Sequence, residues 1–232
     1  MLNALSFQRP TAVRRRQSGL SMVELMVGVA IGLFVVAGAT MAVSNQLGDN
    51  RRLMLETQIQ QDLRAAADVI ARDLRRSGYW ARAQDGVWYA AAVSVTSNPY
   101  TAVTPASGVA SEVDFAYSRG AVENNTRDAT DEAGFRLRDN AIQMRANDQW
   151  QTLTDSTTLR ITDFRVTLTT QDVPLSCLNP CPIGAVACPP TQSVRDVRVE
   201  ISGTAVHDPS VQRNARSQVR LRNDVVNGAC PA

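Results

Sequence analysis

Four cysteines are the residues whose chemistry is easiest to state, because thiols either oxidise in pairs or hold a metal ion. Cys177, Cys181 and Cys188 lie in a proline-rich stretch, and Cys230 follows much later. Common zinc sites have Cys-x2-Cys spacing or a histidine partner, whereas these three are spaced Cys-x3-Cys-x6-Cys without one. We therefore expect two disulfides rather than a metal knuckle. Every complete pairing of the four cysteines joins Cys230 to a cysteine of that stretch.

Other residue types that often carry catalysis or bind ligands occur without a supporting arrangement. His207 is the only histidine and lies in a His-Asp-Pro turn, so the sequence contains no histidine metal site and no histidine-based nucleophile pattern. A group of acidic and amide side chains lacks the spacing of the common calcium loop. That group is Asn124, Asn125, Asp128, Asp131 and Glu132. We expect a surface histidine, no enzyme activity, no cofactor and no metal.

Three arginines, Arg216, Arg220 and Arg222, raise nucleic-acid binding as an alternative. Binding of single strands usually combines such cations with aromatic side chains that stack on bases, and no aromatic residue alternates with these arginines. Asp196 and Glu200, on a neighbouring expected strand, can pair with them. We therefore expect a solvated, partly ion-paired strand face and no nucleic-acid partner.

Glu24 is the most unusual charged residue, because it lies at the start of a long apolar run. From Leu25 to Ala39 the sequence has no charge and no hydroxyl group. A helix of about 20 such residues matches the roughly 30 Å hydrocarbon layer of a membrane. An unpaired carboxylate near that layer is costly, so we expect Glu24 to have a partner or a role.

The residues before the apolar run set its orientation. Residues 1–19 contain four arginines and no acidic residue. Positively charged flanks stay in the cytoplasm, which places the body of the chain on the far side of the membrane. In an ordinary secretory signal the cleavage site follows the apolar segment. Here the plausible site, Gly19, precedes it, so cleavage would leave the apolar helix at the new N-terminus.

An arginine-rich leader, Gly19, the hydrophobic Leu20 and Glu24 together resemble the class III leader of type IV prepilins and type II secretion pseudopilins. The resemblance implies that a prepilin peptidase cleaves after Gly19 and methylates the amino group of Leu20, a position where Phe is commoner. It also implies that Glu24 docks the subunit by meeting the N-terminal amine of a neighbour. Burying these two charges together is physically reasonable, because each offsets the desolvation of the other.

Two further patterns lie along the same expected helix. Gly28 and Gly32 form a small-xxx-small pair, which lets another helix approach closely. The string from Arg72 to Trp80 runs arginine-aspartate-hydrophobe-arginine and then a small residue, glycine and tyrosine. It resembles the helix end of minor pilins of the PilW type, and related segments occur in J-type pseudopilins of type II secretion.

Residues 45–78 are expected to continue the helix as an amphipathic half that ends near Gly78. Apolar residues recur there at intervals of three and four. They are Leu55, Ile59, Leu63, Ala66, Ile70 and Leu74. The Gly48-Asp49-Asn50 sequence predicts a kink or short break between the two halves of the helix.

The remaining residues are predicted to form β structure. Expected strands cover residues 87–96, 112–117, 135–145, 159–169, 194–206 and 217–226. A hairpin turn is expected at Asp139 and Asn140, and surface loops at residues 98–108 and 121–134. The predicted fold class is α+β and type IV pilin-like. Its long N-terminal helix, half transmembrane and half amphipathic, packs on an antiparallel β-sheet domain.

Four segments follow from these patterns. We expect a cleaved leader at residues 1–19, a transmembrane half-helix at 20–44 and an amphipathic half-helix at 45–78. A β-rich periplasmic or extracellular domain at 79–232 carries the disulfides in its C-terminal region. Without the leader the chain has 20 basic and 22 acidic residues, so its overall charge does not favour nucleic acid.

The resemblance implies a non-enzymatic minor pilin that primes the assembly of type IV pili and is incorporated into them, at the tip. The alternatives are a J-like pseudopilin at the tip of a type II secretion pseudopilus, or a membrane-anchored enzyme, DNA-uptake receptor or adhesion component. The implied partners are the prepilin peptidase, other minor pilins, the major pilin, the inner-membrane assembly platform and a large tip adhesin. The expected location is the inner membrane, crossed once with the N-terminus cytoplasmic, and afterwards the pilus.

Overall fold

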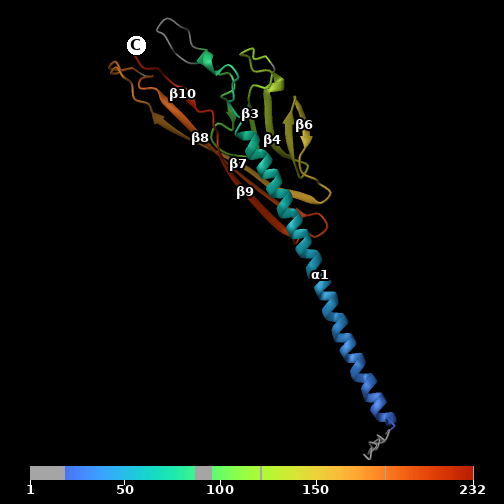
Figure 1. Cartoon of the computed structure of the whole chain (residues 1–232). Coiled ribbons are helices and arrows are strands. Elements are labelled where there is room, and N and C mark those ends of the chain that lie inside the picture. Colours follow the sequence, from blue (N-terminus) through green and yellow to red (C-terminus); the bar gives the residue numbers. More distant parts are fainter. Residues whose placement is uncertain (1–18, 87–95, 121, 186, 232) are drawn as a thin grey trace, which may run out of the picture. The chain divides into compact units, whose positions relative to one another are not determined.

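The structure is a computed structural model that describes residues 19–86, 96–120, 122–185 and 187–231 (Figure 1). The chain divides into two compact units, Met1–Asn50 and Arg51–Ala232. The described part of the first unit is almost entirely helical, and the second contains all of the described strands. The strand predicted at residues 87–96 lies outside the described residues, apart from its last position.

Helix α1 (Met22–Leu74) begins in the first unit and ends in the second. Residues 22–50 are exposed throughout, and the helix is long and apolar enough to cross a membrane. Gly48, Asp49 and Asn50 are helical, so the predicted break does not occur. A single glycine costs a helix only about 1 kcal/mol relative to alanine, which good helix formers on either side can offset.

The second half of α1 buries one stripe of small and aliphatic side chains. The buried residues are Ile59, Leu63, Ala66, Ala67, Ile70, Ala71 and Leu74. This confirms the apolar face predicted from the intervals of three and four, except that Leu55 is only half-buried. The alanines at 67 and 71 widen the stripe.

The end of α1 is tied to the first sheet through Gly78. The helix ends at Leu74. The N–H of Ser77 then donates to the Leu74 carbonyl at 3.0 Å, which closes a tighter turn than that of an α-helix. Gly78 has a φ of 74°, which favours glycine, and its N–H donates to the Ala116 carbonyl at 2.9 Å. The chain therefore leaves the helix at the predicted glycine by pairing with a strand.

The first sheet has five antiparallel strands in the order β1-β3-β4-β5-β6 (Figure 1). They are β1 (Val103–Thr104), β3 (Glu112–Ala116), β4 (Glu132–Arg138), β5 (Ala141–Ala146) and β6 (Gln149–Thr152). Asp139 and Asn140 have φ values of 52° and 58°, which confirms the predicted hairpin turn between β4 and β5. The loop expected at residues 121–134 is too long, because the 3-10 helix η2 (Ala129–Asp131) and the first residues of β4 lie within it.

The second sheet is organised around β8 (Thr191–Ala205), which pairs along one edge with β7 (Leu159–Pro174). The other edge of β8 carries both β9 (Gln212–Arg220) and β10 (Val225–Asn227), and β2 (Gly108–Ala110) pairs with β7. The predicted single strand over residues 217–226 is wrong, because the chain leaves β9 at Arg220 and returns to β8 only at Val225. The short strands β1, β2 and β6 were not predicted, since they hold too few residues for a period to be seen.

One hydrophobic core joins α1 to both sheets. Phe115 and Phe135 come from the first sheet and Phe164 from the second, and all three are buried against the α1 stripe in one cluster. Trp80, Tyr100 and Ala116 form a smaller cluster beyond the end of the helix. The observed architecture is therefore the predicted α+β arrangement, with two antiparallel sheets sharing the helix face.

Removing a buried side chain from α1 should destabilise the second unit much more than the same change at an exposed position of the helix. Leu63 is fully buried, and we expect Leu63→Ala to lower the free energy of unfolding by about 2–5 kcal/mol. Leu53 is 59% exposed, and Leu53→Ala should change it by less than about 0.5 kcal/mol. Urea unfolding of the full chain in detergent measures both, and equal losses would contradict the role of the stripe.

Candidate assembly helix and disulfide-clamped end

The candidate processing and docking residues lie at the start of α1. Gly19 and Leu20 precede the helix and are exposed, so the peptide bond between them is accessible. Glu24 lies in the first turn, where a carboxylate is stabilised by the helix dipole. The N–H of Leu25 donates to the Ser21 carbonyl at 3.1 Å, so the helix is formed around Glu24 from its first turn.

Gly28 and Gly32 present an open face on the same side of α1, because residues four apart lie one above the other. A methyl group added at either glycine would meet nothing within 4 Å. The hydroxyl of Thr40 donates to the Val36 carbonyl of its own helix at 2.6 Å, so it needs no other partner in an apolar surrounding. This half of α1 can therefore accept lipid or another helix along the two glycines.

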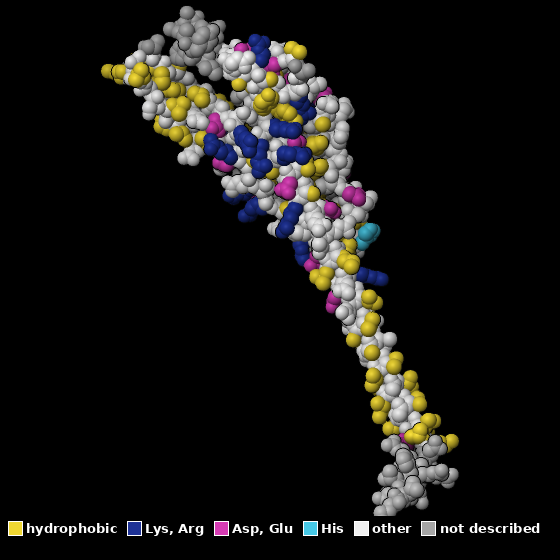
Figure 2. All heavy atoms as spheres, in the orientation of Figure 1, with side chains coloured by type: hydrophobic (Ala, Val, Ile, Leu, Met, Phe, Trp, Pro, Cys, Tyr) yellow, Lys and Arg dark blue, Asp and Glu magenta, His cyan; other side chains and the backbone are white. Residues whose placement is uncertain are grey.

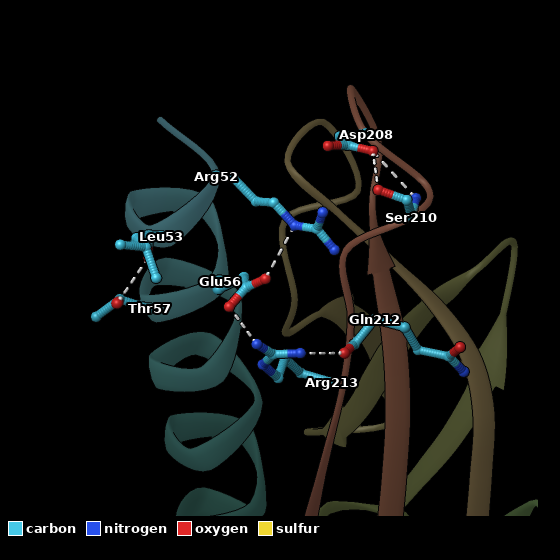
Figure 3. A network of polar contacts seen from close by, with 8 residues as sticks. All are labelled: Arg52, Leu53, Glu56, Thr57, Asp208, Ser210, Gln212 and Arg213. Carbon is cyan, nitrogen blue, oxygen red and sulfur yellow. Dashed lines mark hydrogen bonds and ion pairs between the residues drawn. The ribbon is translucent and has the colours of Figure 1, made fainter. Parts of the chain in front are cut away.

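A polar network attaches the other half of α1 to β9 (Figure 3). One carboxylate oxygen of Glu56 accepts from Arg52 at 3.2 Å, and the other accepts from the guanidinium of Arg213. Arg213 also donates to the Gln212 carbonyl at 2.8 Å. The two partners Glu56 and Arg213 are 157 residues apart, so no local sequence pattern could have identified this contact.

The four cysteines form two disulfides at the end of the β7–β8 ribbon. Cys177 pairs with Cys230 and Cys181 with Cys188, at Cα–Cα distances of 5.4 and 5.6 Å. The sulfurs of Cys177, Cys181 and Cys188 lie within 4.8 Å of one another. This is close enough for a shared metal, but all four sulfurs are bonded in pairs and none is a free thiol.

A buried arginine holds the segment that leads to Cys230. The guanidinium of Arg195 donates to the carbonyls of Thr101 and Asn223, at 2.5 and 3.0 Å. Burial lowers the pKa of Arg195, and the nearby carboxylate of Asp224 opposes this shift. Sequence analysis missed Arg195, although alternation places it on the same face of β8 as the buried Val197.

Acidic side chains of this loop make hydrogen bonds within the fold. Asp131 is buried, and its carboxylate accepts from the backbone N–H groups of Arg119 and Asp128, at 3.1 and 3.0 Å. The hydroxyl of Tyr100 donates to Glu123 at 2.8 Å, and burial together with this carboxylate raises the pKa of Tyr100. In the part of the chain that the structure describes, the three loop cysteines are the one group spaced for a metal. Asp131 therefore joins the start of η2 to the residues that follow β3.

The remaining candidates are solvent-exposed or ion-paired. His207 is exposed, as predicted. The predicted pairing of Arg216 with Glu200 is confirmed, with a nitrogen–oxygen distance of 2.7 Å. Arg220 pairs at 2.8 Å with Asp224, which lies just beyond the end of its own strand, rather than with a residue of β8.

Two protein-family models match the sequence. The model described as prepilin peptidase-dependent protein B matches residues 52–221. The model described as prokaryotic N-terminal methylation motif matches residues 14–40, which include Gly19, Leu20 and Glu24. No curated protein and no solved structure matches the chain.

The two disulfides should contribute unequally to stability, because they close loops of very different length. The Cys177–Cys230 bond spans 53 residues and the Cys181–Cys188 bond spans 7. In the chain-entropy model these loops correspond to about 4 and about 2 kcal/mol. Replacing the first pair by serine should therefore lower the urea midpoint more than replacing the second pair. Equal losses would show that loop closure does not determine the contribution of the two bonds.

Proposed function

The chain belongs to the prepilin peptidase-dependent protein B family, and we propose that this pilin-type subunit is a minor pilin of the PilW type. In this proposal it primes the assembly of type IV pili and is incorporated into them, at the tip. The observation that supports it most strongly is the methylation motif at residues 14–40, which overlaps the start of a helix long and apolar enough to cross a membrane. The string from Arg72 to Trp80, at the end of the same helix, favours the PilW type.

We propose that the prepilin peptidase, the partner implied by the family, hydrolyses the peptide bond between Gly19 and Leu20. This separates the leader, residues 1–19, and leaves a free amine on Leu20 that the same enzyme methylates. Glu24 then meets the amine of a neighbouring subunit in the apolar interior of the assembly. Among the described residues the side chain of Glu24 makes no hydrogen bond or ion pair, and a buried pair of opposite charges avoids the cost of leaving either charge alone.

In this proposal the two halves of α1 lie in different surroundings. Residues 20–44 span the inner membrane before assembly and pack against the helices of other subunits afterwards, with Gly28 and Gly32 at a close contact. Residues 45–78 carry the domain, residues 79–232, on the periplasmic side and later at the cell surface. Exchange of lipid for helices at this apolar surface leaves its side chains out of water throughout.

The partners in this proposal are the other minor pilins, the major pilin, the inner-membrane assembly platform and a large tip adhesin. The role is structural, and the residues support this: the cysteines are consumed in disulfides and His207 is exposed and isolated. The alternative with the same N-terminal motif is a J-like pseudopilin at the tip of a type II secretion pseudopilus. A gene neighbourhood of minor prepilins and an adhesin favours the pilin, and a secretion operon favours the pseudopilin.

The processed chain should begin at Leu20 and carry an N-methyl group. Intact-mass measurement and N-terminal sequencing of the chain from membranes or filaments test this directly. A chain that retains Met1 in cells with an active prepilin peptidase would contradict the processing step. So would a cut after Ala42, behind the apolar run, as in an ordinary secretory signal.

Replacing Glu24 should separate assembly from processing. We expect Glu24→Ala to leave membrane insertion and cleavage intact, because the carboxylate is needed only when subunits meet. Loss of the charge pair should remove the chain from sheared filaments or reduce the number of pili. Asp62→Ala, which removes a carboxylate from the second half of the same helix, is the matched control and should leave incorporation unchanged. Normal piliation and incorporation of Glu24→Ala would contradict the docking role.

A further inference from the structure

The two disulfides of the second unit lie side by side at the end of the β7–β8 ribbon. The sulfur of Cys177 belongs to one bond, and it lies within 4.8 Å of both sulfurs of the other bond, those of Cys181 and Cys188. Disulfides exchange partners when a thiolate attacks a sulfur of a nearby disulfide. A thiolate released at Cys177 therefore has a second disulfide in its immediate surroundings.

The backbone also places Cys177 beside Cys188. The N–H of Leu175 donates to the Pro190 carbonyl at 2.8 Å, which continues the antiparallel register of β7 and β8 past the ends of both strands. Carried two residues further, this register sets Cys177 opposite Cys188. Opposite residues of an antiparallel pair have Cα atoms about 4.5–5.5 Å apart, a separation that a disulfide spans. The observed pairing of both cysteines therefore differs from the one that the register favours.

Cys188 and Cys230 are neighbours as well, and both are only half-buried. The N–H of Ala229 donates to the Ala187 carbonyl at 3.2 Å, which joins the residues next to these two cysteines. Both cysteines line a shallow groove of about 270 Å³. A reagent in this groove therefore has access to a sulfur of each disulfide.

The surroundings of the groove do not repel an anion. Hydrophobic side chains gather over this end of the ribbon, where β7 and β8 meet (Figure 2). Residues 173–194 include no acidic side chain. A thiolate, which is negatively charged, therefore meets no carboxylate of this stretch when it approaches.

We propose that this end of the second unit is a site of thiol–disulfide exchange, at which an exported dithiol moves Cys177 from Cys230 to Cys188. A thiolate of the dithiol, approaching along the groove, attacks the Cys230 sulfur and forms a mixed disulfide. The Cys177–Cys230 bond breaks, and its electron pair stays on Cys177. The second thiol of the dithiol then resolves the mixed disulfide and leaves Cys230 as a thiol.

The second step takes place within the chain. The Cys177 thiolate attacks the Cys188 sulfur, forms the Cys177–Cys188 bond and breaks the Cys181–Cys188 bond, whose electron pair stays on Cys181. Over both steps the dithiol is oxidised to a disulfide, and its two protons pass to Cys181 and Cys230. The chain exchanges two disulfides for one disulfide and two thiols, so one disulfide is reduced for each dithiol oxidised.

The exchange frees the C-terminal segment while the β7–β8 ribbon stays cross-linked at its end. Residues 225–230 are then held by the pairs of β10 with β8 and by the Ala229 hydrogen bond, without a covalent link. Disulfides persist in an oxidising compartment, to which the proposed function assigns this unit, so the dithiol has to belong to that compartment. Apart from this location, the exchange does not depend on assembly into a filament.

Limited reduction of the purified full chain in detergent tests the exchange. The chain is treated with increasing doses of dithiothreitol, its thiols are blocked by alkylation, and the linked peptides are mapped by mass spectrometry. Elastase is used for the digest, because residues 173–194 contain no trypsin site. Among chains that keep one disulfide, we expect the Cys177–Cys188 bond to be the commonest, with Cys181 and Cys230 blocked. If it is rarer than either original bond at every dose, the proposal is wrong.

Cys181→Ser supplies the attacking thiol without a reductant, because it leaves Cys188 unpaired beside the Cys177–Cys230 bond. At about pH 8.5, where half of a free thiol is ionised, Cys188 should attack Cys177 and release Cys230. The matched control adds Cys188→Ser and so lacks the attacking thiol. We expect alkylation of Cys230 to be at least tenfold higher in the single variant than in this double variant, and equal alkylation would overturn the proposal.

Gln218→Cys tests whether the attacking sulfur has to be a neighbour. Gln218 is exposed and pairs with Arg198, roughly 20 Å along β8 from Thr191. Its thiol should leave both original bonds in place, and loss of either bond would overturn the proposal. If Cys181→Ser prevents folding, as circular dichroism shows, limited reduction of the unchanged chain still decides. Absence of the chain from filaments would contradict the proposed function and not the exchange, which is measured on purified protein.

Discussion

The contact between one stripe of α1 and the inner faces of both sheets is the interaction on which the second unit depends. Side chains from Ile59 to Leu74 lie in the same cluster as Phe115, Phe135 and Phe164. Neither sheet can remove its apolar face from water by itself. The helix covers the apolar faces of both sheets. Polar contacts then determine the position of the helix on the two sheets. Glu56 and Arg213 join the helix to β9 at one end, and Gly78 joins it to β3 at the other.

Residues 22–50 of the same helix differ from the buried stripe, because every side chain there is exposed within its own unit. An apolar helix of this kind cannot remain in water, so its stability has to come from lipid or from other helices. We propose that Glu24, at the start of the apolar run, is paired with an amine when other helices surround this part of α1. A single helix thus combines a half that packs on the sheets with a half that is long and apolar enough to cross a membrane.

The far end of the second unit is stabilised differently, because it has little core of its own. Two disulfides hold the β7–β8 end, and buried Arg195 holds the returning chain through backbone carbonyls. Covalent and polar clamps permit a surface that is both apolar and exposed. Leu178 and Ile183 are exposed, so they are not needed inside a core to keep this end folded.

Several features could be predicted from the sequence because they depend on neighbours in the chain. The period of α1, the glycine after it, the hairpin at Asp139 and Asn140, and the motif from Gly19 to Glu24 are all local. Contacts between distant residues could not be predicted, since the four cysteines allow three pairings and only the fold brings Cys177 to Cys230. The same holds for Glu56 with Arg213, for the second sheet, and for Arg195, whose burial is evident only once the register of β8 is known. Local periodicity determines which elements form, and tertiary packing decides which of their side chains meet.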